Sequence, residues 1–192
     1  MTSDACVGME LVAQDAVKKW RQVIGPTNST NAQRDAPDSL RALFGSDGTR
    51  NAVHGSDSVG SYRRETDFWF GGDEPTMRPM QTTAVLNNCT LCLIKPHILK
   101  QNKAGEVIDF ILQAGFEISA MEMFYVSRAV IEEFYCVYKN VIPEYLPIIE
   151  NFSSGPIIAL EVRQKDAVNC FRELCGPHDP EIAKHLRPNT IR

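Results

Sequence analysis

The chain has 192 residues, a formal net charge of −4 and a hydrophobic content of 43%, which is typical of a soluble globular protein of one or two domains. This mildly acidic balance gives no general attraction to nucleic acid or anionic membranes, so a phosphate site would have to be built locally from Arg and Lys side chains. The sequence shows neither an apolar run of the roughly 20 residues that span a bilayer nor a signal-peptide pattern, so we expect no membrane and no specific nucleic acid as partners.

The first part of the chain predicts one strand and two helices. The strand is predicted over residues 7–13, and an amphipathic helix over residues 15–24 that ends at Gly25. After a polar loop, residues 39–44 form a short, partly apolar segment. Residues 56–66 are predicted to form the second helix, because Ser and Asp at its start can serve as N-caps.

An internal repeat relates the two ends of the chain. Residues 10–26 share seven residues with residues 161–177, and every pair has the same offset (161 − 10 = 151). The same offset relates Arg41 to the last residue, Arg192. Because this period is of domain length, we expect two copies of one domain, cut out of phase. The residues that recur are Glu10, Asp15, Ala16, Val17, Arg21, Gly25 and Pro26, as Glu161, Asp166, Ala167, Val168, Arg172, Gly176 and Pro177.

The remainder of the chain predicts alternating strands and helices. Strands are predicted over residues 89–94, 116–124 and 157–162, and helices over residues 104–114, after Ser127, and over residues 145–152 and 166–174. This order favours a single sheet with helices packed on it, an α+β sandwich. We expect residues 1–71 to be the C-terminal part of the first copy, residues 72–88 a linker, and residues 89–192 the N-terminal part of the second copy.

The cysteine pattern predicts free thiols. Six cysteines with irregular spacing and no secretory signal indicate a reducing compartment, which favours the cytoplasm. Cys89 and Cys92 form a C-x-x-C that could be a redox pair or half of a zinc site, but they lie in an apolar run that resembles a buried strand. We therefore expect both to be structural and no metal to be bound by the protein itself.

The segment Arg50–Ser58 is the strongest candidate for chemistry. His54 stands just before a Gly-Ser-Asp-Ser run that predicts a helix start. Helix N-termini attract anions, so this arrangement suits a histidine that meets phosphate. A histidine near a turn is also a common hydrogen-bonded structural residue, and spacing alone leaves both alternatives open.

Arg50–Ser58 closely resembles the active-site signature of the nucleoside diphosphate kinases, whose histidine is phosphorylated during turnover. Three further segments resemble the family's first strand with its lysine, its third strand and its arginine loop: Thr90–Pro96, Ser154–Leu160 and Arg187–Arg192. The resemblance implies a ferredoxin-like βαββαβ sandwich with an antiparallel sheet, present here as two partial copies. The two linked copies are similar to the tandem-domain members of the family, which are found in cilia and centrosomes.

The resemblance also implies roles for individual residues. His54 would carry the phosphoryl group, Glu65 would orient the imidazole, and Ser56 would lie close to the transferring group. Arginine pairs with phosphate oxygens in a bidentate manner, which suits a phosphate clamp. The nucleotide-binding residues implied are Arg21, Thr27, Arg41, Asn51, Lys95, Tyr145, Arg172 and Arg192. Mg²⁺ would be bound through the phosphates of ATP, the phosphoryl donor.

Several positions depart from the family pattern or have simpler explanations. Arg21 and Arg172 could be solvated surface residues, and Tyr145, whose spacing differs from the family by one residue, could be a core aromatic. The second copy has His178 in place of a phosphate-binding threonine. Neither copy is complete, so Lys95 could face a catalytic histidine only in a composite of the two copies.

Taken together, the sequence predicts phosphoryl transfer from ATP to nucleoside diphosphates through a phosphohistidine at His54. The alternative is a catalytically weak or inactive structural protein that associates with axonemal microtubules or centrosomal proteins, and the incomplete copies favour it. A fragment that folds poorly is a third possibility. The resemblance further implies a homo-oligomer and a cytoplasmic, cytoskeletal location at the cilium axoneme or centrosome.

Overall fold

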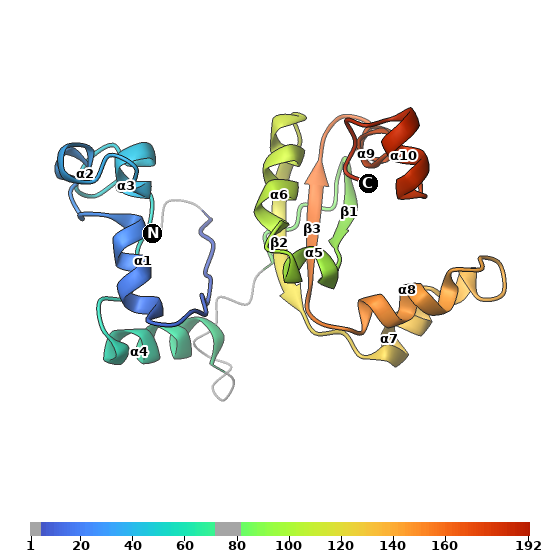
Figure 1. Ribbon diagram of the computed structural model, residues 1–192, viewed down its shortest axis with the longest axis horizontal. Coiled ribbons are helices and arrows are strands. Elements are labelled where there is room, and N and C mark those ends of the chain that lie inside the picture. Colours follow the sequence, from blue (N-terminus) through green and yellow to red (C-terminus); the bar gives the residue numbers. More distant parts are fainter. Residues whose placement is uncertain (1–4, 72–81) are drawn as a thin grey trace. The chain divides into compact units, whose positions relative to one another are not determined.

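A computed structural model describes residues 5–71 and 82–192 (Figure 1). The chain divides into two compact units, Met1–Gln81 and Thr82–Arg192, called here the N-terminal and C-terminal units. The division falls within the predicted linker at residues 72–88, of which residues 72–81 lie outside the described residues. No helix in the described part of the chain is long and apolar enough to cross a membrane.

The described part of the N-terminal unit is helical. The predicted helix over residues 15–24 is confirmed, and Figure 1 shows two short helices together at its C-terminal end. The predicted helix over residues 56–66 also forms, but it begins at Val59, because the Ser58 hydroxyl accepts a hydrogen bond from the backbone N–H of Ser61. The four helices are α1 (Ala16–Ile24), α2 (Ser29–Asp35), α3 (Leu40–Phe44) and α4 (Val59–Phe70).

The predicted strand over residues 7–13 is wrong, because this segment is not part of a sheet. It passes along α4, where Gly8 lies close to the rings of Trp69 and Phe70. The Tyr62 hydroxyl donates a hydrogen bond of 2.8 Å to Glu10 Oε1. A strand requires the backbone groups of a neighbouring strand, and the described residues of the N-terminal unit contain no strand.

The C-terminal unit is built on a three-stranded antiparallel sheet in the order β1-β3-β2. Its strands are β1 (Cys89–Ile94), β2 (Glu117–Phe124) and β3 (Ile157–Arg163), which confirms the three predicted strands. Its α-helices are α5 (Pro96–Lys100), α6 (Ala104–Gln113), α7 (Arg128–Phe134), α8 (Tyr145–Phe152), α9 (Ala167–Cys175) and α10 (Pro180–Leu186). A 3₁₀ turn, η1, spans Cys136–Tyr138. The α+β fold with an antiparallel sheet is therefore confirmed, as a partial copy.

The central strand β3 carries the core of the C-terminal unit. Leu160 and Val162 are fully buried, and Phe116 meets Phe171 of α9 edge to face at 5.6 Å between ring centroids. A second cluster lies around α7 and α8, which Figure 1 places beyond the end of the sheet where β2 ends and β3 begins. Cys92 belongs to the first cluster, and burial raises the pKa of its thiol to about 12. It is therefore an unreactive core residue.

Glu161 of β3 fixes the segment that precedes β1. Its carboxylate accepts hydrogen bonds from the backbone N–H groups of Val85 and Leu86 at 2.7 and 2.6 Å and from the Ser119 hydroxyl at 2.7 Å. Burial would raise the pKa of Glu161, but these bonds and one from Cys89 outweigh it and lower the pKa to about 2. The described part of the predicted linker, residues 82–88, is therefore bound to the C-terminal unit.

The internal repeat is present in the backbone conformation as well. Helices α1 and α9 both begin after an Asp in the left-handed region, Asp15 with φ 53° and Asp166 with φ 56°. Both end at a glycine, Gly25 and Gly176, each with φ 76°. The recurring residues therefore specify the same local structure in both units.

We expect that alanine at Gly25 or at Gly176 destabilises the protein. Only glycine adopts a φ of 76° without strain, and a Cβ on Gly25 would collide with the side chain of Ser39. Gly25→Ala should lower the free energy of unfolding of the N-terminal unit by about 2 kcal/mol. Both tryptophans lie in this unit, so tryptophan fluorescence during urea unfolding should show the shift.

The matched control is Gly176→Ala, which would place a Cβ against Thr190 in the C-terminal unit. It should leave the tryptophan transition unchanged, while far-UV circular dichroism detects a loss of stability elsewhere. Equal tryptophan transitions in Gly25→Ala and wild type would contradict the expectation.

Candidate functional site

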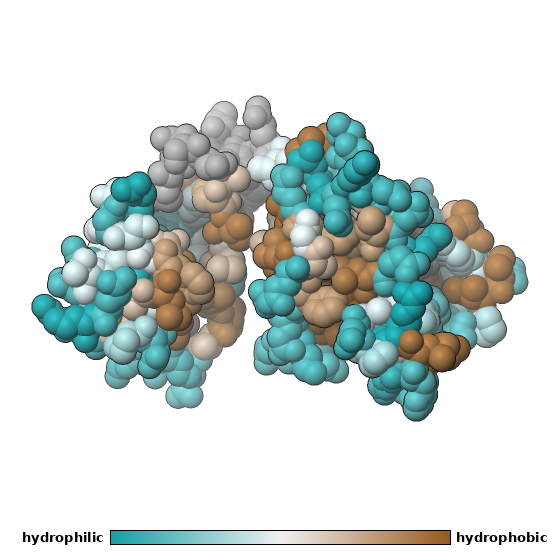
Figure 2. All heavy atoms as spheres, turned by 90° about the horizontal axis from the view of Figure 1, so that it is seen from above, coloured by the Kyte–Doolittle hydropathy of each residue, from teal (hydrophilic) through white to brown (hydrophobic). Residues whose placement is uncertain are grey.

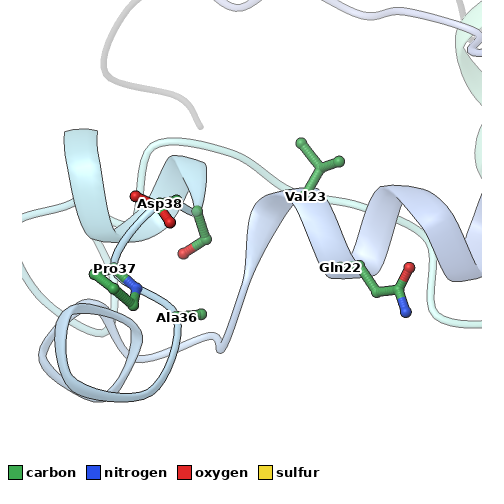
Figure 3. A pocket seen from close by; sticks show the side chains of 6 residues that line it. Gln22, Val23, Ala36, Pro37 and Asp38 are labelled. Carbon is green, nitrogen blue, oxygen red and sulfur yellow. The ribbon is translucent and has the colours of Figure 1, made fainter.

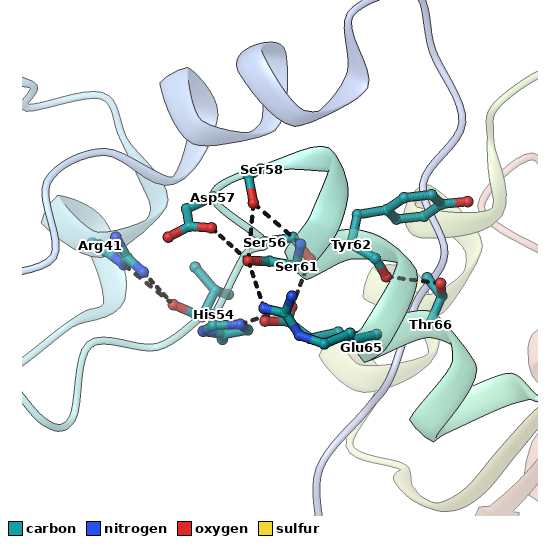
Figure 4. Close-up of polar contacts among 11 residues, drawn as sticks. Arg41, His54, Ser56, Asp57, Ser58, Ser61, Tyr62, Glu65 and Thr66 are labelled. Carbon is teal, nitrogen blue, oxygen red and sulfur yellow. Dashed lines mark hydrogen bonds and ion pairs between the residues drawn. The ribbon is translucent and has the colours of Figure 1, made fainter.

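His54 lies in the loop before α4, and Glu65 of α4 reaches back to it (Figure 4). The imidazole Nε2 is 3.1 Å from Glu65 Oε2. The Ser56 hydroxyl donates a hydrogen bond of 2.6 Å to the same carboxylate oxygen. The His54 side chain is 66% exposed and the Glu65 side chain 39%. The predicted catalytic residues are therefore brought together on an accessible surface.

The charge state of Glu65 determines which imidazole nitrogen of His54 can act as a nucleophile. The hydrogen bond from Ser56, followed by the one from His54, lowers the pKa of Glu65, and burial opposes this only in part. An ionised carboxylate can only accept hydrogen bonds, so Nε2 of His54 must carry a proton. In the neutral imidazole the lone pair then lies on Nδ1, which is the nucleophilic nitrogen.

Arg41 of α3 anchors the backbone just before His54. Its Nε and Nη2 both donate to the carbonyl oxygen of Val53, at 3.2 and 3.1 Å, and Nη1 donates to the Gly25 carbonyl at 2.9 Å. Its side chain is buried, and burial, followed by the positive charge of Arg21, lowers its pKa. A further hydrogen bond from Nη1 goes to Thr27 Oγ1 at 3.5 Å, so the guanidinium binds uncharged oxygens. Arg41 therefore joins three segments around the histidine.

The other predicted residues of the N-terminal unit lie nearby. Asn51 Nδ2 donates to the Thr27 carbonyl at 3.0 Å, which closes the loop that carries the histidine. Hydrogen bonds from Ser61 and Ser58 lower the pKa of Asp57, and the charge of Arg21, which is exposed on α1, adds to this lowering. The N-terminal unit thus holds seven of the predicted site residues: Arg21, Thr27, Arg41, Asn51, His54, Ser56 and Glu65.

The remaining predicted residues belong to the C-terminal unit. Lys95 directly follows β1, and its Nζ lies 5.4 Å from the centroid of the Phe152 ring. Burial, followed by the charge of Arg192, lowers the pKa of Lys95. Arg192 donates a hydrogen bond of 3.0 Å to the Gly176 carbonyl, as Arg41 does to the equivalent Gly25. Arg172 is exposed on α9.

Tyr145 does not suit the nucleotide-binding role predicted for it. The residue is only 9% exposed and belongs to the core cluster with Ile149 and Phe152. This burial leaves no ring face for a nucleotide base, because the apolar side of α8 turns inward. The alternative of a core aromatic fits Tyr145 better.

Tyr135 was not among the site residues predicted from the sequence, but it lies near one of them, Lys95. Its ring centroid lies 5.4 Å from that of Phe152, the ring that Lys95 also faces. Burial raises the pKa of Tyr135, and the charge of Arg192 acts in the opposite direction. The available signal was its position four residues after the buried Ile131, directly after the last residue of α7.

A hollow of about 320 Å³ lies between the C-terminal part of α1 and residues 36–39 (Figure 3). It contains no histidine and no basic side chain, so it offers neither a nucleophile nor a phosphate ligand. Its lining residues are Gln22, Val23, Ala36, Pro37, Asp38 and Ser39. This hollow is therefore a poorer candidate for a phosphate site than the exposed surface around His54.

Comparison with known proteins places the chain in a family. The family model described as nucleoside diphosphate kinase matches residues 1–75 and 88–192. The chain is 47% identical over 195 residues to nucleoside diphosphate kinase homolog 7 of Rattus norvegicus, covering 100% of this chain and 48% of that protein. The chain thus spans about half the length of the curated relatives it matches first.

A shorter relative and its structure cover the same family. Over 103 residues the chain is 36% identical to the nucleoside diphosphate kinase of Aquifex aeolicus, covering 54% of this chain and 72% of that protein. A crystal structure of the Aquifex aeolicus enzyme is similar with a TM-score of 0.52 and 35% identity, covering 55% of this chain and 74% of that one. From the family model and this relative it follows that the chain belongs to the nucleoside diphosphate kinase family.

Proposed function

We propose that this protein transfers a phosphoryl group from ATP to nucleoside diphosphates through His54. The observation that carries the proposal is the 3.1 Å contact between His54 Nε2 and Glu65 Oε2, because it holds the imidazole with Nδ1 as the free nucleophile. Membership of the family supports the same reaction class.

The reaction has two steps through one nitrogen. The Nδ1 lone pair of His54 attacks the γ-phosphorus of ATP, an N–P bond forms, and the bond to the β,γ-bridging oxygen breaks so that ADP leaves with its electron pair. A terminal phosphate oxygen of the acceptor diphosphate then attacks the phosphorus, and the N–P electrons return to Nδ1. Glu65 holds the Nε2 proton and stabilises the positive charge of the ring in both steps.

The residues around His54 fit a nucleotide that brings its own Mg²⁺. Arg21 offers a cation and Thr27 a hydroxyl, which suit phosphate oxygens, whereas the guanidinium of Arg41 is buried against the carbonyls of Val53 and Gly25. Within residues 5–71 and 82–192, no group of three or more His, Cys, Asp or Glu side chains could hold a metal ion. Mg²⁺ bound to the phosphates would neutralise part of their charge.

A non-catalytic role in the ciliary axoneme or centrosome is the second candidate. The observation that favours it is the division of the implied nucleotide-binding residues, because Lys95, Arg172 and Arg192 belong to the C-terminal unit and not to the unit of His54. Under this proposal a tagged His54→Asn chain would still associate with axonemal or centrosomal microtubules in ciliated cells.

Labelling from [γ-³²P]ATP and Mg²⁺ tests the catalytic proposal. We expect acid-labile, base-stable label on the wild-type chain that passes to an added diphosphate. His54→Asn should lower the labelling rate by roughly 10⁴-fold, because asparagine has no nucleophilic nitrogen. The matched control, His185→Asn on α10, should label as the wild type does. Label on the His54→Asn chain, or none on a folded wild-type chain, would reject the proposal.

A further inference from the structure

The hollow between α1 and residues 36–39 has an equivalent place in the C-terminal unit. The offset of 151 relates the six residues that line it to residues 173, 174 and 187–190. The backbone is alike in both places: Ala36, directly after α2, has φ −150° and ψ 67°, and Arg187, directly after α10, has φ −143° and ψ 64°. The difference between the two places therefore lies in the side chains.

In the C-terminal unit an ion pair crosses this place. Arg187 Nη1 contacts Glu173 Oε2, which joins the segment after α10 to α9. In the N-terminal unit Ala36 and Gln22 stand at these two positions, so the cation is missing and a neutral amide replaces its carboxylate partner. Both residues line the hollow, and Figure 3 shows Gln22 on α1 and Ala36 on the segment that faces it. The hollow therefore corresponds to the space that the Arg187 side chain fills in the other copy.

The lining of the hollow suits a cation. Asp38 brings an exposed carboxylate, which takes part in none of the ion pairs found among the described residues. The Ser39 hydroxyl is buried and has no hydrogen-bond partner within residues 5–71 and 82–192. In the other copy the equivalent Thr190 hydroxyl donates to the Arg187 carbonyl at 2.8 Å. Because buried polar groups are normally paired, the unpaired hydroxyl indicates a missing partner.

We infer that this hollow binds the guanidinium group of an arginine side chain on a partner protein. A guanidinium has five N–H donors in one plane, which can serve the Asp38 carboxylate, the Gln22 amide oxygen and the Ser39 hydroxyl together. A lysine ammonium is a compact point charge and lacks this fork. The aliphatic stem of the arginine packs against Val23 and Pro37, which supply apolar walls.

The charge of the lining favours an arginine within a protein segment over free arginine. Free arginine carries a carboxylate of its own, which would lie near Asp38, and none of the six lining residues is basic. An internal arginine has its α-carboxyl group in a peptide bond and brings only the cation. Figure 2 shows hydrophilic and hydrophobic residues on the surface of both units, so the hollow is distinguished by its unpaired polar groups and not by hydropathy. The inference is independent of catalysis by His54.

NMR titration of the full chain with the blocked peptide acetyl-Gly-Gly-Arg-Gly-Gly-amide tests the inference. We expect saturable shifts of the backbone amides of residues 22, 23, 36, 38 and 39. Asp38→Asn, which installs the side chain of Asn189, should weaken binding by about fivefold, because an exposed ion pair is lost. The matched control Asp35→Asn removes the same charge from α2 outside the hollow and should bind the peptide as the wild type does.

Filling the hollow is the second test. Gln22→Glu/Ala36→Arg installs the ion pair of the C-terminal unit and should abolish the shifts, while its tryptophan unfolding transition shows that the variant is folded. A wild-type chain without these shifts overturns the inference. So does equal binding of the corresponding lysine peptide, or binding that persists in the filled variant. Free arginine that binds more tightly than the blocked peptide would overturn the assignment to a protein partner.

Discussion

Replacement of Arg41 by leucine is expected to lower the free energy of unfolding of the N-terminal unit by about 3 kcal/mol. The substitution removes the guanidinium donors that bind the carbonyl oxygens of Val53 and Gly25 and leaves these acceptors unpaired in a partly buried position. Lysine should rescue only part of the loss, since its single ammonium lacks the planar fork that reaches both carbonyls. Urea unfolding followed by tryptophan fluorescence measures the effect.

The repeat supplies the control for Arg41. Arg192 donates to the Gly176 carbonyl in the same manner, but it is exposed in the C-terminal unit. Arg192→Leu should therefore cost less than about 1 kcal/mol and leave the tryptophan transition in place. If Arg41→Leu were as stable as Arg192→Leu, the three-segment anchor would not be a significant source of stability.

Replacement of Glu65 by glutamine is expected to slow phosphorylation of His54 by about 10- to 100-fold. Glutamine keeps the shape and can still accept from Nε2, but it brings no negative charge to stabilise the imidazolium. The effect should be smaller than for a buried carboxylate, because the Glu65 side chain is 39% exposed and water screens its charge. The rate of label incorporation measures the effect.

The pH dependence separates the charge of Glu65 from its shape. The pKa of Glu65 lies below its ordinary value of 4.5, so its contribution is complete above that pH and is lost as the pH falls through the lowered pKa. Ser56→Ala removes the largest cause of the lowering and should raise the pKa, which carboxyl NMR titration would show. An unchanged titration in Ser56→Ala would contradict the shared-oxygen geometry.

Local patterns were sufficient to predict most elements of the C-terminal unit. Along β3, fully buried residues such as Leu160 alternate with partly exposed ones, which is a strand pattern. Ser127 and Asp166 stand at the N-cap positions of α7 and α9 and indicate where these helices begin. The same patterns failed at residues 7–13, because the sequence has strand character but strand structure depends on a neighbour. Local pattern therefore predicts the tendency of a segment and not whether its partner is present.

The site was predictable in composition but not in its contacts. The resemblance identified His54, Ser56 and Glu65. In the structure the side chains of His54 and Ser56 both contact the same carboxylate oxygen of Glu65. That geometry follows from the start of α4 after Ser58, since helical side chains point towards the N-terminus. The bond from Arg41 to the Val53 carbonyl joins residues twelve positions apart through tertiary packing, which no spacing rule predicts.

The two helix ends at Gly25 and Gly176 provide a comparison within one molecule. Both copies had to satisfy the same backbone geometry, so residues shared by them, such as the arginine pair Arg41 and Arg192, are accounted for by shape alone. Positions at which the copies differ are those that shape leaves open, as at Thr27 and His178. In a chimera that exchanges residues 15–41 with residues 166–192, we expect the backbone conformation of both segments to be kept. Only the side chains at positions where the copies differ would then change.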